Sequence, residues 1–152
     1  MNSKFPTKGL SCFWLVIPLL LWNIIFFKQI PAQYNDDSNV DQWLLYAETA
    51  FRLIAFMSPL LLSMKFERKL QKTGLGIYIA GSLFYYGSWL PIMFAPHSSW
   101  SNSPIGILAP YGTPLIVLIG IGLIARSKWY ILVASLFIAL HLTHGIQAFQ
   151  LW

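Results

Sequence analysis

Charged side chains are scarce in this sequence. They make up 10% of its 152 residues, while 57% are hydrophobic and 16% aromatic. A soluble globular chain is typically about 25% charged, so an ordinary soluble domain is excluded. The apolar residues form continuous runs and do not alternate with polar ones, which disfavours a membrane β-barrel. The remaining class is an all-α integral membrane protein.

The residues of several familiar sites are also missing. Cys12 is the only cysteine, so no intrachain disulfide can form. The sequence has no P-loop, dinucleotide-binding fingerprint or Ser-His-Asp set, and we expect no resident cofactor. The formal net charge is +5. Because the basic residues lie in short loops between apolar runs, we expect no binding to nucleic acid.

Five apolar runs predict a single membrane domain, residues 1–152, built as a bundle of five transmembrane helices. A helix needs about 20 apolar residues to cross a hydrocarbon core about 30 Å thick. The expected spans are 10–27, 43–64, 74–94, 108–125 and 129–149. The basic start of the chain is similar to a signal peptide. The length of the first run, with Pro18 and Asn23 inside it, favours a retained helix.

The distribution of Lys and Arg predicts how these helices are oriented. Loops on the cytoplasmic side carry an excess of Lys and Arg. With the N-terminus inside and the C-terminus outside, the outside segments hold only Lys28. The inside segments hold eight: Lys4, Lys8, Lys65, Arg68, Lys69, Lys72, Arg126 and Lys128. The expected location is the bacterial cytoplasmic (inner) membrane.

Small residues are frequent in the third and fourth spans. At helix interfaces they let two backbones approach closely. We therefore expect close helix packing at Gly76, Ala80, Gly81, Gly87, Gly120 and Gly122.

Two charged residues interrupt the second span. Glu48 and Arg52 are four residues apart, which puts them on one helix face in the order that favours an ion pair. A charged side chain at the centre of a membrane helix costs about 2.5–3.5 kcal/mol on insertion scales, and such residues usually face the interior of a bundle. We expect the function to centre on this pair.

Polar residues of other spans are expected at the same depth. A rise of about 1.5 Å per residue puts Glu48 roughly 8 Å and Arg52 roughly 14 Å below the outer end of their helix. On the same rise, His144 lies about 9 Å and His141 about 14 Å from the outer end of the fifth span. Other side chains near this level are Asn23, Tyr85, Trp89, Tyr111 and Gln147. This convergence predicts a polar pocket open toward the outside.

The candidate residues divide by chemistry. Glu48, His141 and His144 are the candidate catalytic residues, because a buried carboxylate or imidazole can move protons. The candidate ligand-binding residues are Arg52, Asn23, Tyr85, Trp89, Tyr111 and Gln147. Among them, Arg52 offers a donor fork to a carboxylate or phosphate. We assign no metal ligand, because the HExxH motif is absent and Arg52 would repel a cation.

The favoured function is binding of a small amphipathic or lipid-like molecule; whether that molecule is also processed is left open. One alternative is an accessory or assembly subunit whose polar residues only hold helices together. Another is a metal-dependent intramembrane enzyme in which His141, His144 and Glu48 hold zinc. The expected partners are membrane lipids and the amphipathic ligand. A second copy of the chain or a partner membrane protein is a further candidate.

Three segments of spans two to five carry a resemblance to other proteins: AETAFRLIAFMSPLLL, PHSSWSNSPIGILAPYGTPLIVLIGIGLI and HLTHG. They resemble small multi-span bacterial membrane proteins of no assigned function. The five-helix, tryptophan-rich plan is also similar in architecture to the translocator-protein family, which binds porphyrins and sterols. The Trp/Pro-rich motifs of that family are absent, so the resemblance implies a membrane bundle and assigns no site residue.

Overall fold

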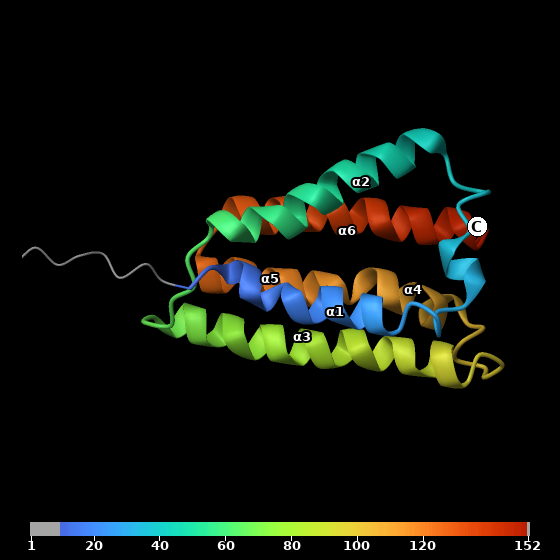
Figure 1. The fold of residues 1–152 in the computed structure, drawn as a ribbon, viewed down its shortest axis with the longest axis horizontal. Helices are drawn as coiled ribbons and strands as arrows, with labels where there is room; N and C mark the ends of the chain where they lie inside the picture. The colour runs from blue at the N-terminus through green and yellow to red at the C-terminus, as the bar shows by residue number, and fades with distance from the viewer. Residues whose placement is uncertain (1–9, 152) are drawn as a thin grey trace, which may run out of the picture.

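The computed structural model describes residues 10–151, which form a bundle of helices without a β-sheet. Its α-helices are α1 (Ile17–Ile25), α2 (Gln42–Met57), α3 (Lys69–Phe94), α4 (Pro104–Gly112), α5 (Pro114–Ala125) and α6 (Lys128–Ala148). Three short 3-10 turns accompany them: η1 (Cys12–Leu15), η2 (Ala32–Asn35) and η3 (Ser58–Leu61). The helices lie side by side along one axis, with α4 and α5 following each other as one rod (Figure 1).

Four helical segments are long and apolar enough to cross a membrane: Gln42–Leu61, Lys69–Phe94, Pro104–Ala125 and Lys128–Ala148. Their length and composition indicate a helical membrane protein. The fifth apolar segment, Cys12–Ile25, is shorter. At a helical rise of about 1.5 Å per residue it is roughly 21 Å long, which is less than the hydrocarbon core.

The first apolar run differs from the continuous helix expected over 10–27. The turn η1 precedes α1, which has Pro18 in its first turn and ends at Ile25. Proline has no backbone N–H and a fixed φ, so it is tolerated where a helix starts but not in its interior. Pro18 therefore divides the run into a 3-10 turn and a short α-helix.

The third and fourth spans begin earlier than expected, at Lys69 and at Pro104. The backbone N–H of Arg68 donates to the Gln71 side chain at 3.0 Å, and the Ser103 hydroxyl accepts from the N–H of Gly106 at 3.0 Å. Both contacts satisfy amide groups that a first helical turn leaves without partners. The third start is missed because Lys69, Gln71 and Lys72 are polar, and the fourth because Pro104 and Gly106 are residues typical of turns.

Helices α3 and α5 make the most extensive contact between elements of the bundle. A Cβ at Gly120 would lie 2.6 Å from the backbone nitrogen of Tyr78, and one at Gly81 would lie 2.8 Å from a backbone nitrogen of α5. A Cβ at Gly76 or Gly87 would meet nothing within 4 Å. Close packing is therefore confirmed at Gly81 and Gly120, while the expectation is wrong for Gly76 and Gly87.

The connections gather at two opposite ends of the bundle (Figure 1). Residues 62–68 and 126–127 lie at one end, which we call the basic end, and residues 26–41 and 95–103 lie at the other, the acidic end. Exposed basic residues flank the first: Lys65, Arg68, Lys69, Lys72, Arg126 and Lys128. The second carries Lys28 with Asp36, Asp37 and Asp41. Lys4 and Lys8 lie outside the described residues.

Candidate functional site

Glu48 lies in the contact between α2 and α6, with 1% of its surface exposed. It shares the buried face of α2 with Leu44 and Ala55. Spacings of four and seven residues repeat on one face of an α-helix, so the periodicity that buries these apolar side chains also buries Glu48. A carboxylate in this position is costly unless it is paired and hydrogen-bonded.

Three side chains contact the two carboxylate oxygens of Glu48. Oε1 accepts a hydrogen bond from Nη2 of Arg52 and lies 2.9 Å from Nδ1 of His141. Oε2 lies 2.5 Å from Nδ1 of His144. An ionised carboxylate can only accept, so both imidazoles present an Nδ1–H to it. The structure thus brings the three candidate catalytic residues and Arg52 into direct contact.

His144 connects Glu48 to the acidic end. Its second ring nitrogen, Nε2, lies 3.2 Å from Oδ1 of Asp37 in the loop before α2. The side chain of Asp37 is 53% exposed, while that of His144 is 10% exposed. Asp37, His144, Glu48 and His141 therefore form a continuous series of polar contacts from the surface to the interior. We call this series the carboxylate–histidine chain.

A second polar contact joins the acidic ends of α2 and α6. Gln147 accepts from the backbone N–H of Asp41 at 2.9 Å and donates to its carboxylate at 2.8 Å. Asp41 is the N-cap residue of α2, directly before its first residue, Gln42. The amide of Gln147, an expected ligand contact, is thus engaged with the start of α2, and it does not line the cavity described next.

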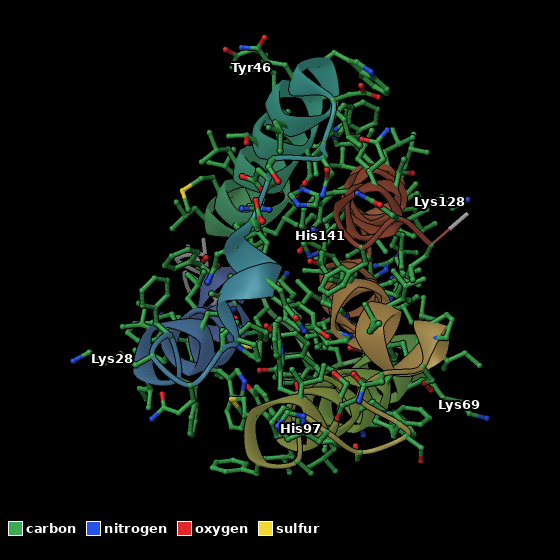
Figure 2. The ribbon with its side chains drawn as sticks, turned by 90° about the vertical axis from the view of Figure 1, so that its right-hand side faces the viewer. Lys28, Tyr46, Lys69, His97, Lys128 and His141 are labelled. Atoms are coloured by element: carbon green, nitrogen blue, oxygen red, sulfur yellow. The ribbon has the colours of Figure 1, made fainter. Side chains whose placement is uncertain are left out.

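A cavity of about 480 Å³ lies beside Arg52 and His141. Small-molecule sites typically measure about 300–1,000 Å³. Of the candidate residues, those that line it are Asn23, Arg52, Tyr85, Trp89, Tyr111 and His141. Glu48, His144 and Gln147 do not line it. Figure 2, a view onto the acidic end, shows His141 projecting from α6 toward the middle of the bundle, whereas Lys28, Lys69 and Lys128 project outward.

Arg52 is the charged side chain of this cavity, and it is 48% exposed. Glu48 is its hydrogen-bond partner among residues 10–151, through one guanidinium nitrogen. A guanidinium has five N–H donors, so most of them remain available. Leu53 and Met57 also line the cavity and are 59% and 44% exposed. The cavity therefore reaches the surface of the bundle beside α2.

Aromatic rings form the rear of the cavity and hold His141. The imidazole centroid lies 4.7 Å from that of Tyr111 and 5.3 Å from that of Phe137, with which it is stacked. Tyr34 of η2 packs against Trp89 at 5.4 Å. The Tyr34 hydroxyl and Trp89 Nε1 are buried without a hydrogen-bond partner in the described chain.

Both residues line the cavity, and each carries a hydrogen-bond donor that is itself buried. Burial raises the pKa of Tyr34 to about 12, so its hydroxyl keeps its proton at neutral pH. The indole N–H of Trp89 is a donor at any pH. Buried polar atoms usually have partners. Both groups are therefore donors without a partner in the described chain, and their buried atoms are shielded from the cavity.

Asn23 fixes the position of α1, which forms one wall of the cavity. Its side-chain oxygen accepts from the Tyr85 hydroxyl at 2.9 Å, and its nitrogen donates to the Leu19 carbonyl at 3.0 Å. The first contact ties α1 to α3. Because both ends of the amide are engaged, Asn23 positions the wall, and its polar atoms are already satisfied.

The described residues contain no group of three His, Cys, Asp or Glu side chains arranged to hold a metal ion. The two imidazoles each direct Nδ1 at a different oxygen of Glu48, which is a hydrogen-bonding arrangement. Arg52 adds positive charge to the same carboxylate. This geometry gives no support to the zinc alternative.

Sequence reasoning missed two contributors to the site, Asp37 and Tyr34. Both lie in the loop between α1 and α2, where no helical periodicity relates a residue to a face. The only signal in the sequence is the cluster of acidic residues in that loop, Asp36, Asp37 and Asp41.

No protein-family model, curated protein or solved structure matches this chain.

Proposed function

We propose that this protein binds a small single-chain amphiphile with an anionic head group in the cavity beside Arg52. The observation that carries the proposal is the place of Arg52: a half-exposed guanidinium within a membrane-spanning helix, at the edge of a cavity. Glu48 holds one of its nitrogens and leaves other donors available. A guanidinium fork matches carboxylate, sulfate and phosphate oxygens.

The other walls suit an apolar tail. Most are aliphatic or aromatic side chains, among them Leu19, Leu20, Leu53, Phe56 and Met57. Because the cavity reaches the bundle surface beside α2, a lipid-like molecule has access to it from the bilayer. Its volume suits a single acyl chain better than a two-chain lipid.

The proposed setting is the bacterial cytoplasmic membrane, crossed five times, with the N-terminus inside and the C-terminus outside. Exposed Lys and Arg side chains at the basic end support this orientation. The short segment Cys12–Ile25 serves as a fifth crossing, since a short span is accommodated by local thinning of the bilayer at modest cost. The η2 residues Tyr34 and Asn35 line the cavity, which supports a position toward the outer leaflet in the proposed orientation.

Retention of hexadecyl sulfate tests this function. The protein is placed in phosphatidylcholine nanodiscs that contain this probe, and the bound mass is read by native mass spectrometry after release. We expect one retained molecule in the wild type. Arg52→Gln should weaken binding about tenfold to 100-fold, because a hydrogen bond to a charged group contributes about 1.5–3 kcal/mol. Arg52→Lys should lie between the two, since it keeps the charge without the fork.

Arg126→Gln is the matched control. Arg126 is exposed at the basic end and takes no part in the cavity, so retention should equal that of the wild type. Equal retention by wild type and Arg52→Gln, or none by either, contradicts the proposal. Bare protein at the mass of a multimer would favour the accessory-subunit alternative.

A further inference from the structure

The two histidines that contact Glu48 differ in how their ring nitrogens are used. Both nitrogens of His144 are engaged, Nδ1 with Glu48 at 2.5 Å and Nε2 with Asp37 at 3.2 Å. His141 uses only Nδ1, which lies 2.9 Å from Oε1 of Glu48. Its Nε2 makes no hydrogen bond within residues 10–151, and it is not one of their enclosed polar atoms that lack a partner. Because the ring lines the cavity, this nitrogen is accessible from the cavity.

Three neighbours fix the orientation of the His141 ring. Glu48 accepts its Nδ1–H, while Phe137 stacks on it at 5.3 Å between centroids and Tyr111 packs at 4.7 Å. A carboxylate that holds Nδ1–H sets the tautomer, so the neutral form of the ring carries its lone pair on Nε2. The neutral imidazole thus presents a basic nitrogen to the cavity, as general base catalysis requires.

Arg52 is the immediate neighbour of this ring. Its Nη2 and the Nδ1 of His141 contact the same oxygen atom of Glu48. The guanidinium keeps donors that Glu48 does not use. A group bound by these donors therefore lies beside the His141 ring, where hydrogen bonds from Arg52 would stabilise a developing negative charge.

An apolar chain and water both have access to this place. Leu53 and Met57 line the cavity where it reaches the bundle surface beside α2. Asn35 of η2 also lines the cavity and is exposed at the acidic end. An amphiphile can therefore enter from the bilayer, while water enters from the acidic end.

We propose that the protein hydrolyses an ester bond of the bound anionic amphiphile, with His141 as the general base that activates water and Arg52 as the group that stabilises the oxyanion. The substrate class is a fatty acyl ester of an alcohol that carries the anionic group close to the ester bond. Glu48 is a positioning residue. The inference rests on the proposed amphiphile site and adds a reaction to it.

The reaction needs only water as a second reactant. Nε2 of His141 takes a proton from water as the water oxygen bonds to the carbonyl carbon, and one electron pair of the C=O bond moves to its oxygen. This oxyanion accepts a hydrogen bond from Arg52. When the double bond forms again, the bond from the carbonyl carbon to the ester oxygen breaks, and Nε2 returns the proton to that oxygen. The products are a fatty acid and an alcohol that carries the anionic group.

Hydrolysis of hexadecanoyl isethionate tests the reaction. The sulfonate of this single-chain ester stays ionised, and its ester bond lies close to that group. The protein in phosphatidylcholine nanodiscs is mixed with the probe, released hexadecanoic acid is measured by mass spectrometry, and the signal of empty nanodiscs is subtracted. We expect hydrolysis by the wild type. In heavy-oxygen water the label should enter the released acid, because the water oxygen attacks the carbonyl carbon.

The role of the base is tested by His141→Gln. Glutamine keeps an N–H donor for Glu48 but has no basic nitrogen. Hydrolysis should slow at least about 100-fold, the lower limit of what a general base usually contributes. Retention of hexadecyl sulfate should stay at the wild-type level, which a loss of structure would lower. His97→Gln is the matched control and should hydrolyse the probe at the wild-type rate, because His97 is exposed in the loop after α3 and does not line the cavity.

The pH dependence adds a test on the wild type. The base must be unprotonated, so the rate should fall with the neutral fraction of His141 as the pH decreases. The ionisable groups around this ring are Glu48 and Arg52 from α2, His144 from α6 and Tyr111 from α4. His144 is the other imidazole among them. His144→Gln should therefore keep the acid limb of the profile, whereas the residual rate of His141→Gln should lack it.

Each outcome decides between the two proposals. Retention of hexadecyl sulfate without hydrolysis of the ester overturns the reaction and leaves the binding function intact, whereas no retention removes both. Equal rates in His141→Gln and wild type overturn the role of His141, and an unlabelled acid overturns the attack by water. Should His141→Gln fail to fold, the wild-type profile decides, because a rate that stays constant toward low pH contradicts the general base.

Discussion

At the scale of single residues, the site depends on how one buried charge is compensated. Glu48 is almost completely buried from solvent, and its carboxylate contacts one guanidinium and two imidazoles. A buried ion pair is not by itself a gain in stability, because desolvation opposes the attraction. Removal of one member is different, since the partners keep their desolvation cost without compensation.

Glu48→Gln should therefore destabilise the protein. We expect a loss of about 3 kcal/mol or more, the usual effect of breaking a buried pair from one side. The free energy of unfolding in dodecyl maltoside micelles, followed by tryptophan fluorescence, measures it. Glu67→Gln is the control, because Glu67 is exposed in the loop before α3 and forms no ion pair with the described residues. Similar stabilities of the two variants would show that Glu48 is not held in the ionised form.

At the scale of elements, two helix pairs have different roles. The α2–α6 pair carries the polar contacts of the site, with the Asp41–Gln147 contact at its acidic end. The α3–α5 pair carries tight apolar packing at glycines. Because α3 and α5 approach so closely, they form a rigid support for the aromatic wall that α3 presents to the cavity.

Gly120→Ala tests this support. The new methyl group would meet the backbone of Tyr78, which cannot move aside as a flexible side chain can. We expect destabilisation by about 1–3 kcal/mol, the usual cost of overpacking. Gly76→Ala is the matched control in a helix interior with open space, and it should stabilise the protein by about 0.5–1 kcal/mol. Thermal unfolding of both variants in the same micelles gives the comparison. Equal shifts would contradict close packing at Gly120.

At the scale of the whole molecule, charge is distributed along the bundle axis. Basic residues flank the connections at one end, while Asp36, Asp37 and Asp41 lie at the other. Because loops rich in Lys and Arg favour the cytoplasmic side of a membrane, this asymmetry predicts that the basic end lies inside and the acidic end outside.

Labelling of single introduced cysteines tests the orientation. Ser99→Cys in the loop after α3 should react with a membrane-impermeant maleimide on intact cells. Glu67→Cys at the basic end should react only after the cells are opened. Both positions are exposed, and the native Cys12 is fully buried, so it does not need to be replaced. The reverse pattern would invert the topology.

Much of this protein was determined by sequence alone, because the responsible signals are local. Continuous apolar runs indicated membrane helices, and a spacing of four put Glu48 and Arg52 on one face. The helical rise then predicted His141 and His144 at the depth of that pair, and the structure brings all four side chains into contact.

Tertiary structure decided the rest, because it depends on where loops and helix faces meet. Only the folded chain brings Asp37 to His144, engages Gln147 with Asp41 and places Tyr34 in the cavity wall. These contacts join residues about 100 positions apart or lie in loops, where no periodicity applies. The shortened first helix has a local cause in Pro18, but whether a helix stops or bends at a proline depends on the packing around it.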